Sequence, residues 1–296
     1  MDPAEETRVT ADWLAFGLTG AVGHALLDEW RPGEARLTAV TRREPPSRAG
    51  IDWHRGDLGG WTPPQPAYDV VISVGPLHEF SRWYERAGPA SARVVALGST
   101  SVHSKPRSVD PAERELAGRL ADAETRLAAA CTARGAALTL LRPTLIYGVG
   151  RDRNLTRFVD LARRWRVIPL PRGATGLRQP VHAADVAAAV LAGARRPGPV
   201  PGRFDLPGGE TLRYDEMVRR TLAAAVPSAR IWRLPDAAFG AALGLARATG
   251  AVTDAGEGMQ RRLGEDLVYD AAPVRSALGV TLRPFAPAAA MFAASD

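Results

Sequence analysis

The fold of this chain is decided by the stretch Asp12-Trp-Leu-Ala-Phe-Gly17-Leu-Thr-Gly20-Ala-Val-Gly23-His-Ala-Leu-Leu-Asp-Glu-Trp30. A short apolar run ends at Gly17, two more glycines follow at three-residue steps, and an amphipathic pattern begins at Val22. This order predicts a buried strand, a tight turn and a helix. Glycines in such a turn let the backbone approach a pyrophosphate, which then faces the free N–H groups of the helix N-terminus. The spacing is G-x-x-G-x-x-G, so an ordinary glycine-rich turn is the alternative explanation.

The composition is that of a globular chain whose basic residues are scattered. The 296 residues are 46% hydrophobic and 24% charged, which is enough for one large core with a smaller lobe attached. The formal net charge is +6, but the basic residues form no run of five or more, so we expect no nucleic-acid partner. Lys105 is the only lysine.

Cysteine usage and the N-terminal sequence favour a cytoplasmic protein. Cys131 is the only cysteine, which excludes an intrachain disulfide and a cysteine zinc cluster, and we predict no metal site. The N-terminus, Met1-Asp-Pro-Ala-Glu-Glu, is acidic where a signal peptide would be basic. No apolar run reaches the roughly 20 residues of a membrane span. The nearest case, residues 237–252, is interrupted by Arg247 and is expected to form a packed helix of the smaller lobe.

Strand and helix patterns alternate through the first half of the chain. After the opening unit, strands are expected at 35–41, 51–58, 68–76, 93–101 and 137–143, with a long helix over 111–134. Continuous apolar strands separated by helices predict a parallel sheet that is covered on both faces. Right-handed crossovers make this a Rossmann-type, doubly wound α/β fold.

The second half has shorter elements, separated by prolines and glycines. We expect a helix at 155–165, a strand at 167–170 and a buried helix that follows His182 and Asp185, which we interpret as helix-start and packing residues. The predicted division is a dinucleotide-binding domain over 1–150, with 178–200 packing back on it, and a substrate lobe made of 151–177 and 201–296. A cleft between the two is where a substrate would bind.

At this point the chain resembles the short-chain dehydrogenase/reductase superfamily, in particular its extended and atypical branches, which are similar to NAD-dependent epimerases and dehydratases. The resemblance covers about residues 12–285. It rests on the order and spacing of several motifs: Gly17-x-x-Gly20-x-x-Gly23, Gly56-Asp57-Leu58, Gly98-Ser-Thr-Ser-Val102, Arg142-Pro-Thr-Leu-Ile-Tyr147-Gly148, Gln179-Pro-Val-His-Ala-Ala-Asp185, Phe204-Asp-Leu-Pro-Gly-Gly-Glu210, and Tyr269-Asp270 with Leu278-Gly279.

The resemblance implies a site for a nicotinamide dinucleotide. The glycine turn would pass under the pyrophosphate, Asp57 with Leu58 would meet the adenine ring, and Gly75 with Pro76 would flank the far side of the cofactor. The expected cofactor-binding residues are Gly17, Thr19, Gly20, Ala21, Val22, Gly23, Arg42, Arg43, Asp57, Leu58, Gly75, Pro76 and Pro143.

The cofactor choice depends on Arg42 and Arg43, at the end of the second expected strand. An acidic residue there accepts hydrogen bonds from the 2′-hydroxyl of NAD, whereas an arginine accommodates the 2′-phosphate of NADP. We therefore expect NADP(H) in preference to NAD(H), with one of these arginines pairing with the phosphate. The alternative is that both are solvated surface charges.

The catalytic half of the family pattern is missing. Members of the superfamily use a tyrosine that exchanges a proton with the substrate and a lysine four residues later. The lysine lowers the pKa of the tyrosine. Glu124 matches the family glutamate and places Leu116 and Leu120 at these two positions. Because residue 101, four before Lys105, is serine, the chain contains no Tyr-x-x-x-Lys.

The residues left for catalysis are Ser99, Thr100 and His103. Ser99 matches the family serine, Thr100 is adjacent, and His103 could act as a general acid near neutral pH, although a loop histidine is more often a surface residue. Arg151 and Arg153, like Arg172 and Arg178, could face an anionic substrate or solvent.

Two classes of function stay open. The first is an atypical oxidoreductase or sugar-nucleotide epimerase. The second is a non-catalytic NADPH-binding protein, similar to the redox-sensing regulators of the family or to the NADPH-binding accessory subunit of respiratory complex I. The family often dimerises through paired helices, and a homodimer face would include Leu116 and Leu120.

Overall fold

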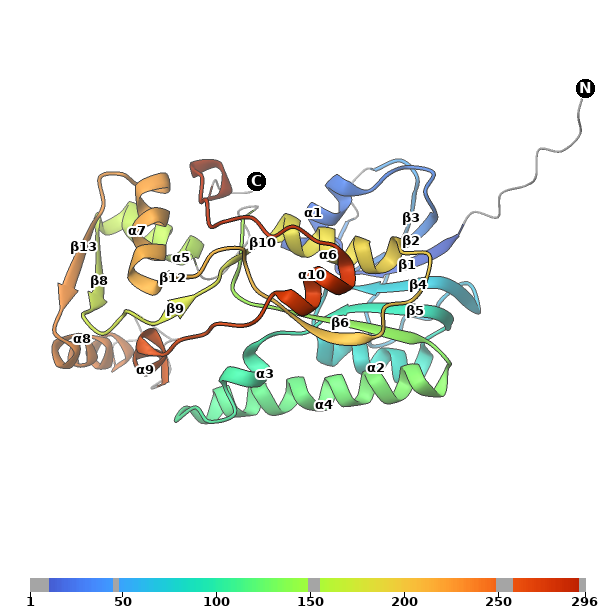
Figure 1. Cartoon of the computed structure of the whole chain (residues 1–296), viewed down its shortest axis with the longest axis horizontal. Helices are drawn as coiled ribbons and strands as arrows, with labels where there is room; N and C mark the ends of the chain where they lie inside the picture. Colours follow the sequence, from blue (N-terminus) through green and yellow to red (C-terminus); the bar gives the residue numbers. More distant parts are fainter. Residues whose placement is uncertain (1–10, 45–47, 149–154, 249–257, 293–296) are drawn as a thin grey trace, which may run out of the picture.

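A parallel sheet of seven strands forms the centre of the computed structural model, which describes residues 11–44, 48–148, 155–248 and 258–292 (Figure 1). Its strands run in the order β11-β6-β5-β4-β1-β2-β3. They are β1 (Asp12–Phe16), β2 (Arg36–Thr41), β3 (Ile51–Arg55), β4 (Ala67–Ser73), β5 (Ala90–Leu97), β6 (Ala137–Pro143) and β11 (Gly202–Leu206). From β1 the chain adds strands in one direction and from β4 in the other. The carboxyl ends of β1 and β4 are therefore the switch point at which ligands bind in such sheets.

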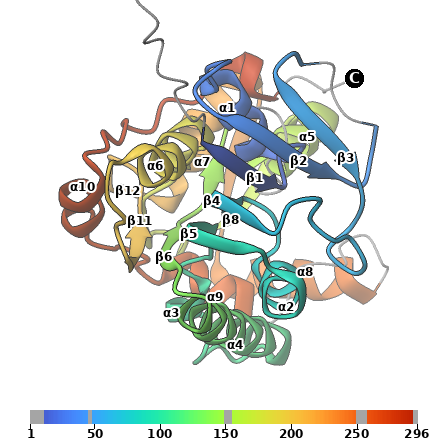
Figure 2. The ribbon, with the colours of Figure 1, turned by 90° about the vertical axis from the view of Figure 1, so that its right-hand side faces the viewer.

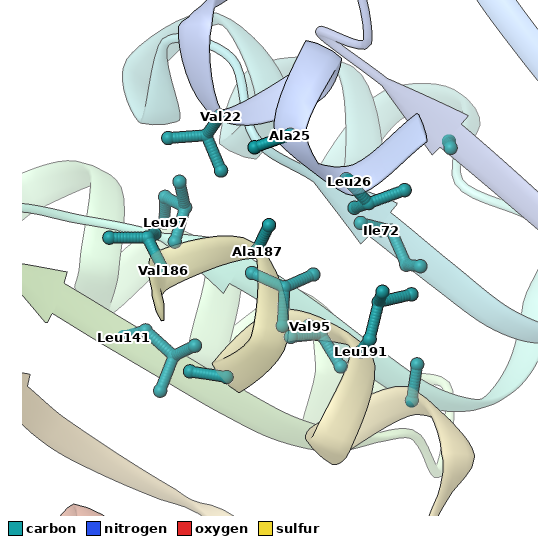
Figure 3. Packing of buried hydrophobic residues seen from close by; sticks show 14 of the residues in the cluster. Val22, Ala25, Leu26, Ile72, Val95, Leu97, Leu141, Val186, Ala187 and Leu191 are labelled. Carbon is teal, nitrogen blue, oxygen red and sulfur yellow. The ribbon is translucent and has the colours of Figure 1, made fainter. Parts of the chain in front are cut away.

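Helices cover both faces of this sheet (Figure 2). On one face lie α1 (Ala21–Glu29) and α6 (Ala183–Arg195), and on the other lie α2 (Leu77–Ala87) and α4 (Pro111–Ala133). Side chains alternate along the strands, so Val70 and Ile72 belong to the core under α1 and α6 while Val71 belongs to the opposite core. Figure 3 shows the first of these cores.

Local signals explain the long helix α4. Asp110 is its N-cap, and the Oδ1 atom of Asp110 accepts a hydrogen bond from the N–H of Ala112 at 2.9 Å. Pro111 occupies the first helical turn, where its missing N–H costs nothing. The helix is followed by Gly135, with φ +67°, which lets the chain reverse into β6. A single turn of helix, α3 (Ser101–Ser104), lies between β5 and α4.

The smaller lobe has a core of its own, made largely by residues on α5 (Leu155–Trp165), β8 (Val167–Pro171), α7 (Tyr214–Ala225) and β13 (Arg230–Leu234). Strands β8 and β13 pair in parallel. The remaining elements are β7 (Ile146–Tyr147), β9 (Leu177–Arg178), β10 (Val181–His182), β12 (Leu212–Arg213), α8 (Asp236–Ala248), α9 (Gly258–Gly264), α10 (Ala272–Leu278) and the 3₁₀ turn η1 (Ala289–Phe292).

The predicted fold class, a doubly wound parallel sheet with a smaller lobe, is confirmed. The strand at 137–143 and the helix at 155–165 have the expected bounds. One assignment differs: β11, which the sequence placed in the smaller lobe, pairs with β6 at the edge of the main sheet. This five-residue strand contains only two large apolar side chains, Phe204 and Leu206, so its apolar pattern is short. The domain boundaries themselves stay a prediction.

Helix α8 covers most of the apolar run at 237–252, and its first two turns are packed unevenly. Phe239 is buried, whereas Ala237, Ala238, Ala241 and Ala242 are exposed. Residues 249–252 lie outside the described part of the chain. Among the described residues, no helix combines the length and apolar character that crossing a bilayer requires.

Candidate dinucleotide site and strand-end cluster

The glycine turn after β1 is shaped by close backbone contacts. Gly17 has φ +86°, and a Cβ there would lie 2.6 Å from the backbone nitrogen of Gly75, which follows β4. A Cβ on Gly23 would lie 2.4 Å from the carbonyl oxygen of Gly17 and from backbone atoms of Leu18. The N–H of Gly20 donates to the carbonyl of Gly17 at 3.0 Å. Gly17 and Gly23 are therefore required by the turn itself, and the turn brings Gly75 against it at the switch point.

Helix α1 presents an uncapped N-terminus behind this turn. Its N-cap is Gly20, which has no side chain to accept a hydrogen bond, and the first turn contains no acidic residue. The first intrahelical bond runs from the N–H of His24 to the carbonyl of Gly20 at 2.9 Å. The N–H groups of Ala21, Val22 and Gly23 thus precede the helical ladder, where they and the helix dipole favour an anion. These features fit the pyrophosphate of a dinucleotide.

The two arginines at the end of β2 are exposed. Thr41, the last residue of β2, is buried, and its hydroxyl accepts from the N–H of Arg43 at 3.2 Å. This contact fixes the backbone from which the Arg42 and Arg43 side chains extend into solvent. In the described part of the chain neither guanidinium pairs with a carboxylate, so both are free to bind a phosphate group such as the 2′-phosphate of NADP.

The carboxylate of Asp57 stabilises the turn after β3 by accepting hydrogen bonds from its backbone. The Oδ1 atom of Asp57 accepts from the N–H groups of Gly59 at 2.7 Å and Gly60 at 3.2 Å. Leu58 is half-buried and packs against the core under α2 and α4. The Asp57 carboxylate is therefore held at the carboxyl end of β3, at the same edge of the sheet as the glycine turn.

Ser99 and Thr100 follow β5 after a single glycine, Gly98. The N–H of Ser101 donates to the Oγ of Ser99 at 3.2 Å, and Ser99 is half-buried. Thr100 is buried, and its hydroxyl donates to the carbonyl of Pro143 at the end of β6 at 3.3 Å. The structure therefore brings Thr100 and Pro143 together, and of the two hydroxyl groups that of Ser99 is the more exposed.

His103, on α3, belongs to a charged cluster at the ends of β6 and β11. Its Nε2 atom lies 3.0 Å from Oδ1 of Asp205 and 3.3 Å from Nη1 of Arg142. Arg142 in turn holds Glu124, on α4, through two bonds, of which that from Nε to Oε1 is 2.9 Å. Glu124 is buried, and the hydrogen bonding that Arg142 donates to this carboxylate is the main cause that raises the pKa of Arg142.

The C-terminal segment between α9 and α10 lies over this cluster and the end of β5. The hydroxyl of Tyr269 donates to the carbonyl of Thr100 at 3.4 Å, and its ring centroid lies 5.9 Å from that of His103. Burial raises the pKa of the Tyr269 hydroxyl above its ordinary range. The N–H of Tyr269 donates to Oε1 of Gln179 at 2.7 Å. Tyr269 therefore contacts Thr100 and lies next to His103. The sequence did not indicate this proximity.

Three cations lie near one another beneath the same segment. Arg262 pairs with the buried Glu113, and the Nζ atom of Lys105 lies 3.9 Å from Oε1 of that carboxylate. Burial, with Arg262 nearby, lowers the pKa of Lys105. Arg178 is also buried, donates to the main-chain carbonyls of Leu177, Arg262 and Glu265, and has a pKa that burial lowers. Glu113 pairs with Lys105 and Arg262, and the charges of Glu265 and Asp266 act on Arg178, so carboxylates accompany all three cations.

The remaining residues singled out in the sequence lie at a helix start, on a helix face or at the surface. His182 caps α6, with its Nδ1 accepting from the N–H of Ala184 at 3.1 Å, and the buried Asp185 accepts from Arg283 at 2.6 Å, which confirms them as helix-start and packing residues. Leu116 and Leu120 are half-buried on α4. Arg172 is exposed, and Arg151 and Arg153 lie outside the described residues.

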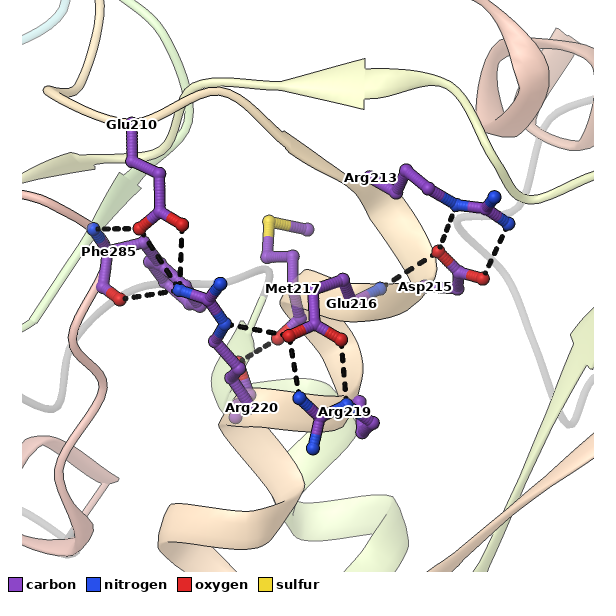
Figure 4. A network of polar contacts seen from close by, with 9 residues as sticks. Glu210, Arg213, Asp215, Glu216, Met217, Arg219, Arg220 and Phe285 are labelled. Carbon is purple, nitrogen blue, oxygen red and sulfur yellow. Dashed lines mark hydrogen bonds and ion pairs between the residues drawn. The ribbon is translucent and has the colours of Figure 1, made fainter.

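A second charged region covers α7 and β13 in the smaller lobe. A hollow of about 420 Å³ there is lined by Arg213, Asp215, Glu216, Arg219, Ile231 and Arg233. Figure 4 shows that its acids and arginines bind one another, for example Glu216 with Arg219 at 2.6 Å and with Arg220 at 2.8 Å. None of the predicted site residues lines it. In the described part of the chain, no cluster of three or more histidine, cysteine or carboxylate side chains could hold a metal ion.

Comparison with known proteins supports the fold. No family model and no curated protein matches the sequence. Among solved structures, MoeE5 in complex with UDP-glucuronic acid and NAD has a TM-score of 0.67 at 19% identity, over 93% of this chain and 94% of that one. UDP-N-acetylglucosamine 4-epimerase from Bacillus cereus has a TM-score of 0.59 at 15% identity, over 76% of this chain and 86% of that one. The terminal R domain of the myxalamid PKS-NRPS pathway has a TM-score of 0.65 at 19% identity, over 96% of this chain and 90% of that one. The chain thus shares its fold with MoeE5, with the Bacillus cereus epimerase and with this R domain.

Proposed function

We propose that this chain binds NADP(H) and acts as an atypical short-chain oxidoreductase or sugar-nucleotide epimerase on an anionic small molecule. The observation that carries the proposal is the uncapped N-terminus of α1 behind the glycine turn, at the switch point of the sheet. The residues that would hold the cofactor are those expected from the sequence: Gly17, Thr19 to Gly23, Arg42 and Arg43, Asp57 with Leu58, Gly75 with Pro76, and Pro143. A bound nicotinamide would supply or accept a hydride.

The preference for NADP(H) rests on Arg42 and Arg43. Both side chains are exposed at the end of β2, where the adenosine ribose lies in this fold. A guanidinium forms paired hydrogen bonds with a phosphate and gives no comparable advantage with a 2′-hydroxyl. MoeE5 was solved with NAD, so the choice in this chain depends on its own residues.

Isothermal titration with NADPH and NADH tests this preference directly. We expect NADPH to bind at least tenfold more tightly, a difference of about 1.4 kcal/mol. The double variant Arg42→Ala/Arg43→Ala should lose that difference and leave NADH binding unchanged. The variant Arg31→Ala, another exposed arginine near α1, serves as the control. Equal or tighter binding of NADH by the native chain would exclude the NADP preference.

Of the three candidates Ser99, Thr100 and His103, we propose Ser99 and His103 as the catalytic residues. The Ser99 hydroxyl accepts one backbone hydrogen bond and keeps its own proton to donate to a substrate oxygen. Thr100 donates to Pro143 and is therefore better placed to hold the end of β5 than to contact a substrate. His103 is 41% exposed, which leaves it accessible to a bound molecule.

The cations under the C-terminal segment support an anionic substrate. Lys105, Arg178 and Arg262 are partly or wholly buried near one another with Glu113, Glu265 and Asp266 close by, and such a cluster of ammonium and guanidinium donors can bind an anion. UDP-glucuronic acid is a suitable probe. Its binding should raise the melting temperature, and Arg262→Met should abolish that increase, whereas the exposed control Arg261→Met should retain it. An unchanged increase in Arg262→Met would exclude this location.

The absence of Tyr-x-x-x-Lys favours a second candidate, a non-catalytic NADPH-binding regulatory or accessory protein. Purified protein that binds NADPH, shows no turnover with carbonyl compounds or nucleotide sugars, and keeps its biological effect in Ser99→Ala would support it. A homodimer through the α4 face that contains Leu116 and Leu120, and a cytoplasmic location, are further proposals. Sedimentation of the native chain and of Leu116→Glu tests the first of these.

A further inference from the structure

His103 makes two contacts at Nε2 that one tautomer cannot satisfy together. Asp205 can only accept a hydrogen bond, and Arg142 can only donate one. Nε2 lies 3.0 Å from Oδ1 of Asp205 and 3.3 Å from Nη1 of Arg142. The shorter contact is with Asp205, the acceptor, and the Nε and Nη2 groups of Arg142 donate to Glu124. The geometry therefore favours the tautomer in which Nε2 carries the proton and donates it to Asp205.

Rigid elements hold this pair at the substrate edge of the sheet. Asp205 lies on β11 directly opposite Arg142 on β6, in the register of the parallel pair. The Glu124 carboxylate on α4 fixes Arg142, and the ring of Tyr269 lies 5.9 Å from the imidazole at an angle of 38°. His103 lies four positions after Ser99, which follows β5. A tautomer fixed by Asp205 leaves Nδ1 of His103 as the lone-pair nitrogen.

We propose that His103 is the proton-transfer group of the dinucleotide site and that Asp205 is its positioning residue. The proposal rests on the proposed function. In the reducing direction, a bound reduced nicotinamide would supply the hydride that forms the new C–H bond. The imidazolium form of His103 would give its Nδ1 proton to the carbonyl oxygen of the substrate, which becomes the alcohol, and solvent would return the proton to His103. This pair supplies the exchangeable proton that Leu116 and Leu120 cannot supply.

The charged and titratable groups that face His103 come from every neighbouring element. They are Asp205 on β11, Arg142 on β6, Glu124 on α4 through Arg142, and Tyr269 from the C-terminal segment. His54 provides a matched control, since its Nε2 lies 2.9 Å from Oδ2 of Asp52. That pair is on β3, the edge strand at the opposite side of the sheet from β11.

Nitrogen-15 NMR of the histidine rings in the cofactor-free protein tests the pairing. For the neutral ring of His103 we expect the proton on Nε2. In Asp205→Asn, whose amide can donate to Nε2, the proton should move to Nδ1, while Asp52→Asn should change His54 alone. A proton on Nδ1 of His103 in the native protein, or no change in Asp205→Asn, would overturn the assignment.

Carbethoxylation by diethyl pyrocarbonate, measured residue by residue by mass spectrometry, tests whether His103 faces the site. Saturating NADP⁺ should slow modification of His103 at least fivefold and leave His54 unaffected. Binding of NADP⁺ in the same sample, measured by titration, without this protection would overturn the role of His103 and leave the proposed function standing. If NADP⁺ does not bind at all, both the proposed function and the role of His103 are refuted.

Discussion

The two glycines at the start of α1 should respond differently to the same substitution. A Cβ on Gly23 would lie 2.4 Å from the carbonyl oxygen of Gly17 and from two backbone atoms of Leu18, so the backbone must move by about 1 Å to reach ordinary contact. Overpacking of this kind costs about 1–3 kcal/mol, which the higher helix propensity of alanine offsets by up to about 1 kcal/mol. We expect Gly23→Ala to lose about 1–2 kcal/mol of stability.

Gly20→Ala is the matched comparison. Its Cβ would lie 3.3 Å from the same carbonyl oxygen, a contact that a shift of a few tenths of an ångström relieves. The loss of glycine at the N-cap costs about 0.5 kcal/mol. The added methyl group nevertheless stands at the mouth of the anion site. Gly20→Ala should therefore melt near the native temperature and bind NADPH at least tenfold more weakly.

Thermal denaturation followed by circular dichroism, with NADPH titration on the same samples, separates these effects. A loss of 1–2 kcal/mol corresponds to a melting temperature lower by about 2–8 °C for a chain of this size. If Gly23→Ala melts within 1 °C of the native chain, the close packing of Gly23 on Leu18 is refuted. If Gly20→Ala keeps native affinity, the phosphate does not bind at this helix N-terminus.

Three further predictions concern groups away from the glycine turn. Glu124→Ala leaves the half-buried Arg142 without its main carboxylate partner and should cost about 3–5 kcal/mol in urea denaturation, whereas Glu124→Leu/Arg142→Leu should recover part of this loss; a cost below 1 kcal/mol would contradict the importance of this pairing. Hydrogen bonds from Arg219 and Arg220 lower the pKa of Glu216 from 4.5 to about 2, so this group stabilises the fold above pH 4.5 and loses that contribution as the pH falls through about 2. When the pH is lowered from 4.5 to about 2, Glu216→Gln should therefore lose less unfolding free energy than the native chain, and the difference should be about 1 kcal/mol or less because the ion pairs are solvated. Equal losses in the two proteins, measured by urea denaturation at each pH, would contradict the lowered pKa. Burial raises the pKa of Cys131 from 9.0 to about 12, so a thiol reagent at pH 8 should label it about a thousandfold more slowly in the folded protein than in urea, and rapid labelling of the folded chain would show that the thiol is accessible.

The central sheet was predictable because its signals are local. The apolar run of β6 and the caps of α4 lie within a few residues of the elements that they define, and the glycine turn occupies seven consecutive positions. Strand β11 was missed because Phe204 and Leu206 give too short a pattern to distinguish a sheet strand from a loop of the smaller lobe. Its place in the sheet depends on pairing with β6, some 60 residues earlier.

The candidate site was predictable only where it follows a strand end. Ser99, Thr100 and Pro143 occupy such positions, and the contact between Thr100 and Pro143 follows from the pairing of β5 with β6. The partners of these residues come from distant segments. His103 and Asp205 are 102 positions apart, and Tyr269 is 169 positions from Thr100. No periodicity connects such positions, so their contacts appear only when the chain is folded.

Leu116 and Leu120 stand where the family pattern has tyrosine and lysine, so α4 offers no proton donor at these two positions. These residues are half-buried on α4, and Glu124, one turn further on, is committed to Arg142. Among the described residues, the groups with exchangeable protons near the ends of β5, β6 and β11 include Ser99 after β5, His103 on α3 and Tyr269 before α10. In a dinucleotide site built this way, a proton donor on α3 can approach a bound substrate from the β6 and β11 side of the sheet, so replacing Asp205 should alter proton transfer without altering dinucleotide affinity.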